Sequence, residues 1–147
     1  MYSYTLDPDA VAHITGGRDG TLRGEVEFFQ KPGGVLVKAY VSGLPADSPS
    51  GFFALHIHEG DSCAGAGFPG TKGHFNPAGA LHPTHAGDLP PLLSNQGHAY
   101  LAVLTDRFTV RDIMGRTVVI HDGPDDFRSQ PAGNPGSKIA CGVIVRP

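Results

Sequence analysis

The amino-acid sequence predicts an all-β domain, an antiparallel β-sandwich of seven to eight strands with two long loops. Several short runs are rich in β-branched and aromatic residues and are bounded by turn residues. None of these runs shows a convincing helical period. The 21 glycines and 13 prolines form no repeat or low-complexity tract, so they are read as turn and loop residues.

The predicted strands share this β-branched and aromatic composition and are punctuated by turn residues. They cover residues 10–15, 22–30, 35–41, 52–59, 98–105, 116–121 and 139–145. The segment KPGG between the second and third runs predicts a hairpin, because Pro32 fixes φ and the glycines tolerate positive φ. A short helical turn is expected near residues 109–115.

Two segments, about residues 60–96 and 122–137, interrupt this pattern and are dense in Gly, Pro, Asp and Asn. Loops this long in a compact domain are usually functional. Their histidines and aspartates point to a binding site.

Length and charge limit the classes of function. A chain of 147 residues is expected to form one domain, residues 1–147. The formal net charge is −3 and there is no Lys/Arg cluster, so we expect no nucleic-acid partner and no membrane-surface partner. The N-terminus resembles no signal peptide, and no apolar stretch approaches the roughly 20 residues of a membrane helix. A soluble, cytoplasmic protein is expected from the sequence as written, or an exported one if a leader has been removed.

The two cysteines, Cys63 and Cys141, lie far apart in the sequence, so they form no CxxC motif. They are either two thiols or one long-range disulfide, and two buried thiols are the default for a cytosolic protein.

Six of the eight histidines fall into three tight groups. In the first group, His56 and His58 share one face of a predicted strand, because side chains alternate along a strand. Two imidazoles on one face form half of a metal site, although such pairs also occur on ordinary polar faces.

The second group contains His74, His82, His85 and Asp88 within one loop segment. Three imidazoles and one carboxylate complete a tetrahedral zinc set. The alternative, a solvated His-rich turn, leaves the stiffening prolines and glycines of this segment unexplained.

The third group is the segment RTVVIHDGPDDF, in which His121 ends a predicted strand. A single histidine at a strand end is structural more often than it is a ligand. His13 and His98 have no neighbouring ligand types, and we interpret them as surface or strand-edge residues.

Five segments in register together resemble the copper/zinc superoxide dismutase family over most of the chain, from about residue 10 to the end: HIHEGDSC, GHFNP, HAGDL, GRTVVIH and GNPGSKIACGVI. The resemblance implies a Greek-key β-sandwich, or flattened barrel, of the immunoglobulin-like kind. It also implies copper and zinc as cofactors and superoxide, a small anion, as substrate.

The resemblance implies a role for each member of the site. Copper would be held by His56, His58, His74 and His121, and zinc by His74, His82, His85 and Asp88. His74 would bridge the two metals, and Asp125 would link a copper histidine to a zinc histidine. Cys63 and Cys141 would form the family disulfide.

Two departures from the family pattern affect these expectations. His82 and His85 are separated by only two residues, so the zinc loop is shortened, but all four ligand types remain. Lys138 stands where the family usually has an arginine that guides the anion, which replaces a planar fork by a point charge. Arg128 is the second candidate for that role.

The implied reaction converts two superoxide anions and two protons to O₂ and hydrogen peroxide. The main alternative is a copper- and zinc-binding module on the same fold with little dismutase activity. A zinc hydrolase is disfavoured, because the zinc set is already closed by four residues, and a purely structural domain would not need seven ligand-type residues. A homodimer is compatible with the resemblance.

Overall fold

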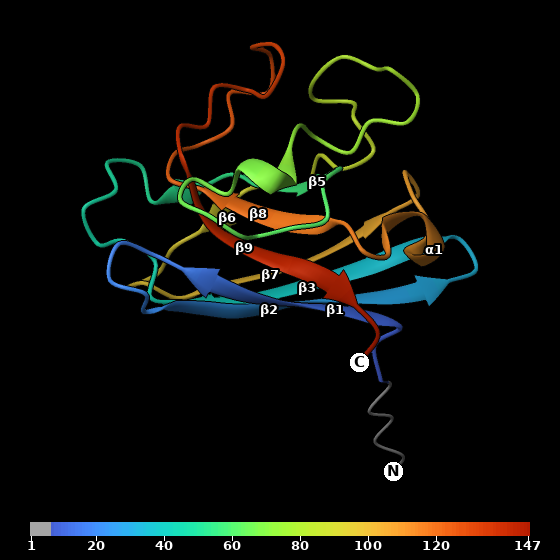
Figure 1. Cartoon of the computed structure of the whole chain (residues 1–147), viewed down its shortest axis with the longest axis horizontal. Coiled ribbons are helices and arrows are strands. Elements are labelled where there is room, and N and C mark those ends of the chain that lie inside the picture. The colour runs from blue at the N-terminus through green and yellow to red at the C-terminus, as the bar shows by residue number, and fades with distance from the viewer. Residues whose placement is uncertain (1–6) are drawn as a thin grey trace.

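The computed structural model describes residues 7–147 and has an all-β architecture, as predicted (Figure 1). Seven strands form one antiparallel sheet in the order β5-β8-β9-β1-β2-β3-β7. Their bounds are β1 Ala10–Gly16, β2 Leu22–Lys31, β3 Gly34–Ser42, β5 Leu55–His58, β7 Ala99–Thr105, β8 Thr117–His121 and β9 Lys138–Val145. Each bound agrees with a predicted run to within one or two residues, except in the 52–59 segment.

The sheet curls into two layers, with β5, β8 and β9 above β1, β2, β3 and β7 (Figure 1). Inward-facing side chains of both layers pack into one hydrophobic core that includes Phe28, Leu55, Val118 and Ile144. In β2 and β3 buried and more exposed residues alternate, as expected for strands with one face on the core. β5 and β8 are instead buried at every position, because their outer face is covered by the loops that form the site.

The predicted strand 52–59 is divided at Ala54 into β4 Phe52–Phe53 and β5. β4 leaves the main sheet and pairs with β6 Leu92–Leu93, a two-residue strand that lies inside the predicted 60–96 loop. The prediction of one continuous strand was therefore wrong at this point, since the apolar run does not show which sheet each half joins.

The predicted hairpin and helical turn are both confirmed. Lys31 pairs with Gly34 across the tight turn between β2 and β3. The helix α1 Val110–Ile113 begins with a capping box, in which Thr109 and Asp112 exchange side-chain to backbone hydrogen bonds. No helix within residues 7–147 has the length and apolarity needed to span a membrane.

The long loop after β5, which includes the 3₁₀ turn η1 Pro69–Thr71, and the loop between β8 and β9 rise on the same side of the molecule (Figure 1). Both loops therefore converge over the face of β5 and β8 that carries the first and third histidine groups.

Candidate metal centre

β5 and β8 are adjacent antiparallel strands, in which His56 pairs with Val119 and His58 with Thr117. The ring of His121, at the end of β8, lies 5.2 Å from the His56 ring and 5.5 Å from the His58 ring, centroid to centroid. The loop that carries the second histidine group is attached to β5 by two isolated β-bridges, His56 with Asp88 and His58 with His74. The fold thus brings all three histidine groups of the sequence together. All six of these histidines are buried.

The first cluster consists of His56, His58, His74 and His121, whose ligand atoms can all lie within 4.8 Å of one another. The partners of the outer ring nitrogens decide which nitrogens carry lone pairs. His56 Nε2–H donates to Asp125 Oδ2 at 2.8 Å, and His58 Nδ1–H donates to the Lys72 carbonyl at 2.8 Å.

The ring nitrogens that face the centre of this cluster receive no hydrogen bond. His58 Nε2 and His121 Nε2 face each other at 3.3 Å, yet the Nδ1 atoms of both rings point to backbone carbonyls, at 2.8 Å and 3.4 Å respectively. Both Nε2 atoms therefore carry lone pairs and cannot hydrogen-bond to each other. His56 Nδ1 and His74 Nε2 are buried without any hydrogen-bond partner. A cation placed among these nitrogens would satisfy all of them.

Burial keeps two histidines of the first cluster, His58 and His121, uncharged. Desolvation lowers the pKa of His58 to about 2 and that of His121 to about 3. Neutral imidazoles are the form that binds transition metals, and an all-nitrogen set suits copper.

The second cluster consists of His74, His82, His85 and Asp88. His74 Nδ1 lies 2.8 Å from Asp88 Oδ1 and 3.1 Å from His85 Nδ1. His82 Nδ1 lies 3.0 Å from Asp88 Oδ2, but at an angle that makes no hydrogen bond. Three imidazole nitrogens and a carboxylate that converge in this way suit a tetrahedral zinc ion.

His56 lies close to both clusters, because its ligand atoms also fall within 4.8 Å of those of His74, His82 and Asp88. Since its Nε2 is bound to Asp125, only Nδ1 is available as a ligand. His56 can therefore serve only one of the two sets.

Asp125 joins the two clusters. Its Oδ2 accepts from His56 Nε2 at 2.8 Å, and its Oδ1 accepts from His82 Nε2 at 2.7 Å. Burial would raise the pKa of Asp125, but the hydrogen bonds from these histidines outweigh it and hold that pKa below its usual value. The carboxylate thus fixes the tautomers of both rings and directs both Nδ1 atoms inward.

Gly133 covers this carboxylate from the loop between β8 and β9. Its φ of +82° is unfavourable for other residues, and a Cβ atom there would overlap Asp125 Oδ1 and lie 2.6 Å from His82 Nε2. Only glycine lets the loop pass this close to the bond between Asp125 and His82.

A hollow of about 400 Å³ opens above the first cluster and is lined by His58, His74, His121, Lys72 and Lys138, among others. The Lys138 ammonium donates to Thr71 Oγ1 at 2.7 Å and to the Lys72 carbonyl at 3.0 Å, so one of its three donors remains free. Among the residues that the structure describes, Arg128 does not line this hollow.

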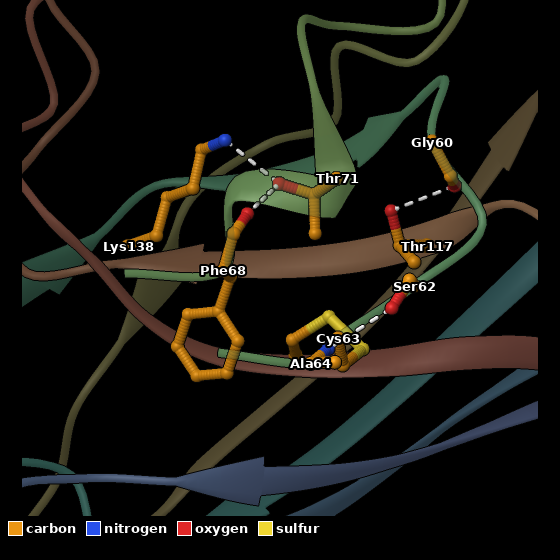
Figure 2. The surroundings of a disulfide bond; sticks show 9 residues. Gly60, Ser62, Cys63, Ala64, Phe68, Thr71, Thr117 and Lys138 are labelled. Carbon is orange, nitrogen blue, oxygen red and sulfur yellow. Dashed lines mark hydrogen bonds between the residues drawn. A yellow bond between two sulfur atoms is a disulfide. The ribbon is translucent and has the colours of Figure 1, made fainter. Parts of the chain in front are cut away.

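The disulfide between Cys63 and Cys141 ties the loop after β5 to β9 (Figure 2). Around it, the Thr117 hydroxyl donates to the Gly60 carbonyl at 3.1 Å. The fully buried Thr71 hydroxyl donates to the Phe68 carbonyl at 2.8 Å and accepts from Lys138 (Figure 2). The base of the loop is therefore anchored beside Lys138.

Sequence reasoning missed the contributions of Lys72, which acts through its carbonyl, and of Gly133, which acts through the absence of a side chain. It also missed Gln130, whose side-chain amide hydrogen-bonds to the His82 backbone. The positive φ of Gly133 gave no signal in a segment already rich in glycine. His13 and His98 lie exposed on the outer face of the sheet, away from both clusters.

Comparison with known proteins agrees with this geometry. A profile of the copper/zinc superoxide dismutase family matches residues 22–144. The chain is similar to the copper/zinc superoxide dismutase 2 of Aquifex aeolicus, with 38% identity over 97% of this chain and 90% of that protein. It is also similar to the human copper chaperone for superoxide dismutase, with 34% identity over 93% of this chain and 53% of that protein. Among solved structures, the clock protein EA4 has a TM-score of 0.80 and 29% identity, with full coverage of both chains.

Proposed function

Because the chain belongs to the copper/zinc superoxide dismutase family, we propose that it is itself a superoxide dismutase. It would convert two superoxide anions and two protons to O₂ and hydrogen peroxide. The observation that supports this most directly is the position of His74, whose two ring nitrogens face different clusters: Nδ1 contacts Asp88 and His85, and Nε2 lies buried in the first cluster. A module that only stored two metals would not need one ring shared between them.

The proposed ligand assignment rests on the nitrogens without a hydrogen-bond partner and, for His85, on its Nδ1, which lies 3.1 Å from His74 Nδ1 and 3.3 Å from Asp88 Oδ2. Copper would be held by His56 Nδ1, His58 Nε2, His74 Nε2 and His121 Nε2, and zinc by His74 Nδ1, His82 Nδ1, His85 Nδ1 and an oxygen of Asp88. His56 belongs to copper in this scheme, because zinc is already complete with four ligands. When bound, copper supplies a centre that alternates between two oxidation states, and zinc supplies a fixed charge that makes the imidazolate of His74 accessible.

Proton transfer, ring orientation and anion binding would fall to residues of the chain itself. His74 Nε2 could accept a proton and later give it to the product, while Nδ1 keeps its place beside Asp88 Oδ1. Asp125 keeps His56 and His82 oriented through their Nε2 atoms. Lys138, whose third ammonium donor is unused, would bind the incoming anion in the hollow above His58 and His121.

The second candidate is a copper-transfer or metal-binding module, which the similarity to the copper chaperone supports. Reconstitution followed by metal analysis and a superoxide assay separates the two. A dismutase should contain one copper and one zinc per chain and should disproportionate superoxide rapidly. His58→Ala should abolish the activity, whereas His98→Ala should not, since His98 lies exposed outside both clusters. Full metal content with no activity would establish the metal-binding module instead.

A further inference from the structure

We propose that Gln130 and Arg107 form a clamp on the backbone of residues 82–85 and act as positioning residues for the zinc set. The inference rests on the proposed function, since it assumes that His82 and His85 bind zinc. Neither residue belongs to the zinc loop. Gln130 comes from the loop between β8 and β9, and Arg107 from the segment after β7.

Gln130 holds His82 at two points. Its side-chain Oε1 accepts from the His82 backbone N–H at 2.9 Å, and its Nε2 donates to the His82 carbonyl at 2.7 Å. Nε2 also donates to the Arg128 carbonyl at 3.1 Å, which fixes the amide to its own loop. The amide therefore pairs with His82 as a neighbouring strand would.

Arg107 holds the next part of the same segment. Its guanidinium donates to the Pro83 carbonyl at 2.8 Å and to the His85 carbonyl at 3.2 Å. The two side chains together bind three of the four carbonyl groups in residues 82–85. Both zinc-type histidines of this segment are therefore fixed through their own main chain.

The shortened spacer explains why such a clamp matters. Only Pro83 and Thr84 separate His82 from His85, so a shift of the backbone moves both rings at once. Asp125 fixes the His82 ring through Nε2, but it does not fix the position of the His82 main chain. The His85 ring has no comparable partner on an outer nitrogen among the described contacts, so its placement depends on its backbone. Arg107 holds that backbone at the carbonyl, together with Asp88, whose Oδ2 accepts from the His85 N–H at 3.0 Å.

If Arg107 acted through its charge, its removal would change the zinc affinity in the opposite direction. Arg107 is a cation next to a proposed cation site, and removing it would tighten zinc binding if simple electrostatics dominated. The clamp predicts weaker binding, because the segment that positions two ligands would be released. The two explanations therefore predict opposite changes in zinc affinity.

The test is a zinc titration of the full-length chain, freed of metal, in competition with a chromophoric chelator. The variants are Gln130→Ala, Arg107→Ala and Arg107→Lys, with Arg111→Ala as a matched control on α1. We expect the two alanine variants each to weaken zinc binding about tenfold, as loss of an outer partner of a metal ligand typically does. Arg107→Lys should recover part of the loss, because an ammonium can still donate to these carbonyls. The control should match the parent chain.

Two further measurements separate positioning from general destabilisation. The absorption spectrum of Co²⁺ in the zinc set should change in the alanine variants, and the free energy of unfolding of the metal-free chain should not change. Unaltered or tighter zinc binding in both alanine variants overturns the proposal, as does a loss matched by Arg111→Ala. If the parent chain itself binds no zinc, the proposed function fails rather than the clamp.

Discussion

His74 is the residue on which the proposed chemistry depends, because its two nitrogens face the two clusters. His74→Ala should abolish the magnetic coupling between the metals in protein that holds Cu²⁺ and Co²⁺, and should lower the turnover. The electron paramagnetic resonance spectrum of the substituted protein checks this. His98→Ala, a histidine exposed on the outer face, should leave the coupling intact. Coupling that survives in His74→Ala would mean that another residue bridges the metals.

A second prediction for a single residue concerns Gly133. Gly133→Ala should weaken zinc binding by about tenfold or more, because the new Cβ would collide with the bond between Asp125 and His82 and the backbone has a positive φ. Gly33→Ala is the matched control, since a Cβ there meets no atom within 4 Å. Chelator competition measures both. Equal zinc affinity in the two variants would show that the loop moves aside without consequence for the site.

At the scale of elements, the strands could be predicted because alternation and β-branched composition are local properties of the sequence. The exception is the predicted strand 52–59, which the structure divides. The run 52–59 is continuously apolar on one side, and its division at Ala54 depends on pairing with β6, which is only two residues long. Such pairing depends on tertiary contacts, which a local sequence pattern does not encode.

The candidate site, too, could be predicted from the sequence only in part. The spacing of His56 with His58, and of His82 with His85, predicted which residues would gather. It did not predict the ring tautomers, which depend on Asp125 and the Lys72 carbonyl, or the contacts of Gln130 and Arg107. Exposed side chains that bind backbone carbonyls leave no recognisable spacing, so only the folded structure reveals them.

The disulfide connects two elements, and its effect is predicted at that scale. Cys63 and Cys141 close a segment with a sequence separation of 78 residues. In the chain-entropy model this closure contributes about 4.5 kcal/mol, and loss of such a bond typically costs about 2–5 kcal/mol. Cys141→Ser should lower the free energy of unfolding by an amount in that range, measured by denaturant titration.

Reduction of the parent chain is the control for this prediction, since it should reproduce the loss of stability while leaving Cys141→Ser unaffected. Thiol titration of the denatured, unreduced parent chain should find no free thiol. Two reactive thiols in active protein would contradict the prediction.

At the scale of the whole molecule, the net charge of −3 opposes the approach of an anion, so any attraction must be local. Lys138→Glu should lower the second-order rate constant with superoxide, by roughly 10-fold or more, and should invert its dependence on ionic strength. Stopped-flow or pulse-radiolysis kinetics at several salt concentrations measure both quantities. Lys138→Arg should keep the rate constant or raise it, because a planar fork holds an anion in a more defined geometry.

Lys31→Glu makes the same change in net charge on the hairpin between β2 and β3, and it serves as the matched control. If Lys138→Glu changes the rate constant no more than this control does, steering belongs to the overall field or to another cation such as Arg128. Metal content should be the same in all of these variants, because none of them alters a proposed ligand.

Asp125 has a thermodynamic consequence that reaches across the whole centre. One carboxylate holds a ring from each cluster, and His74 has a nitrogen in each, so under the proposed function occupancy of one set would change the free energy of binding at the other. Linkage requires this coupling to be reciprocal: the factor by which zinc changes the affinity for copper equals the factor by which copper changes the affinity for zinc. The order in which the two metals were loaded would therefore alter only the rates of assembly, and the filled protein would be the same at equilibrium by either route.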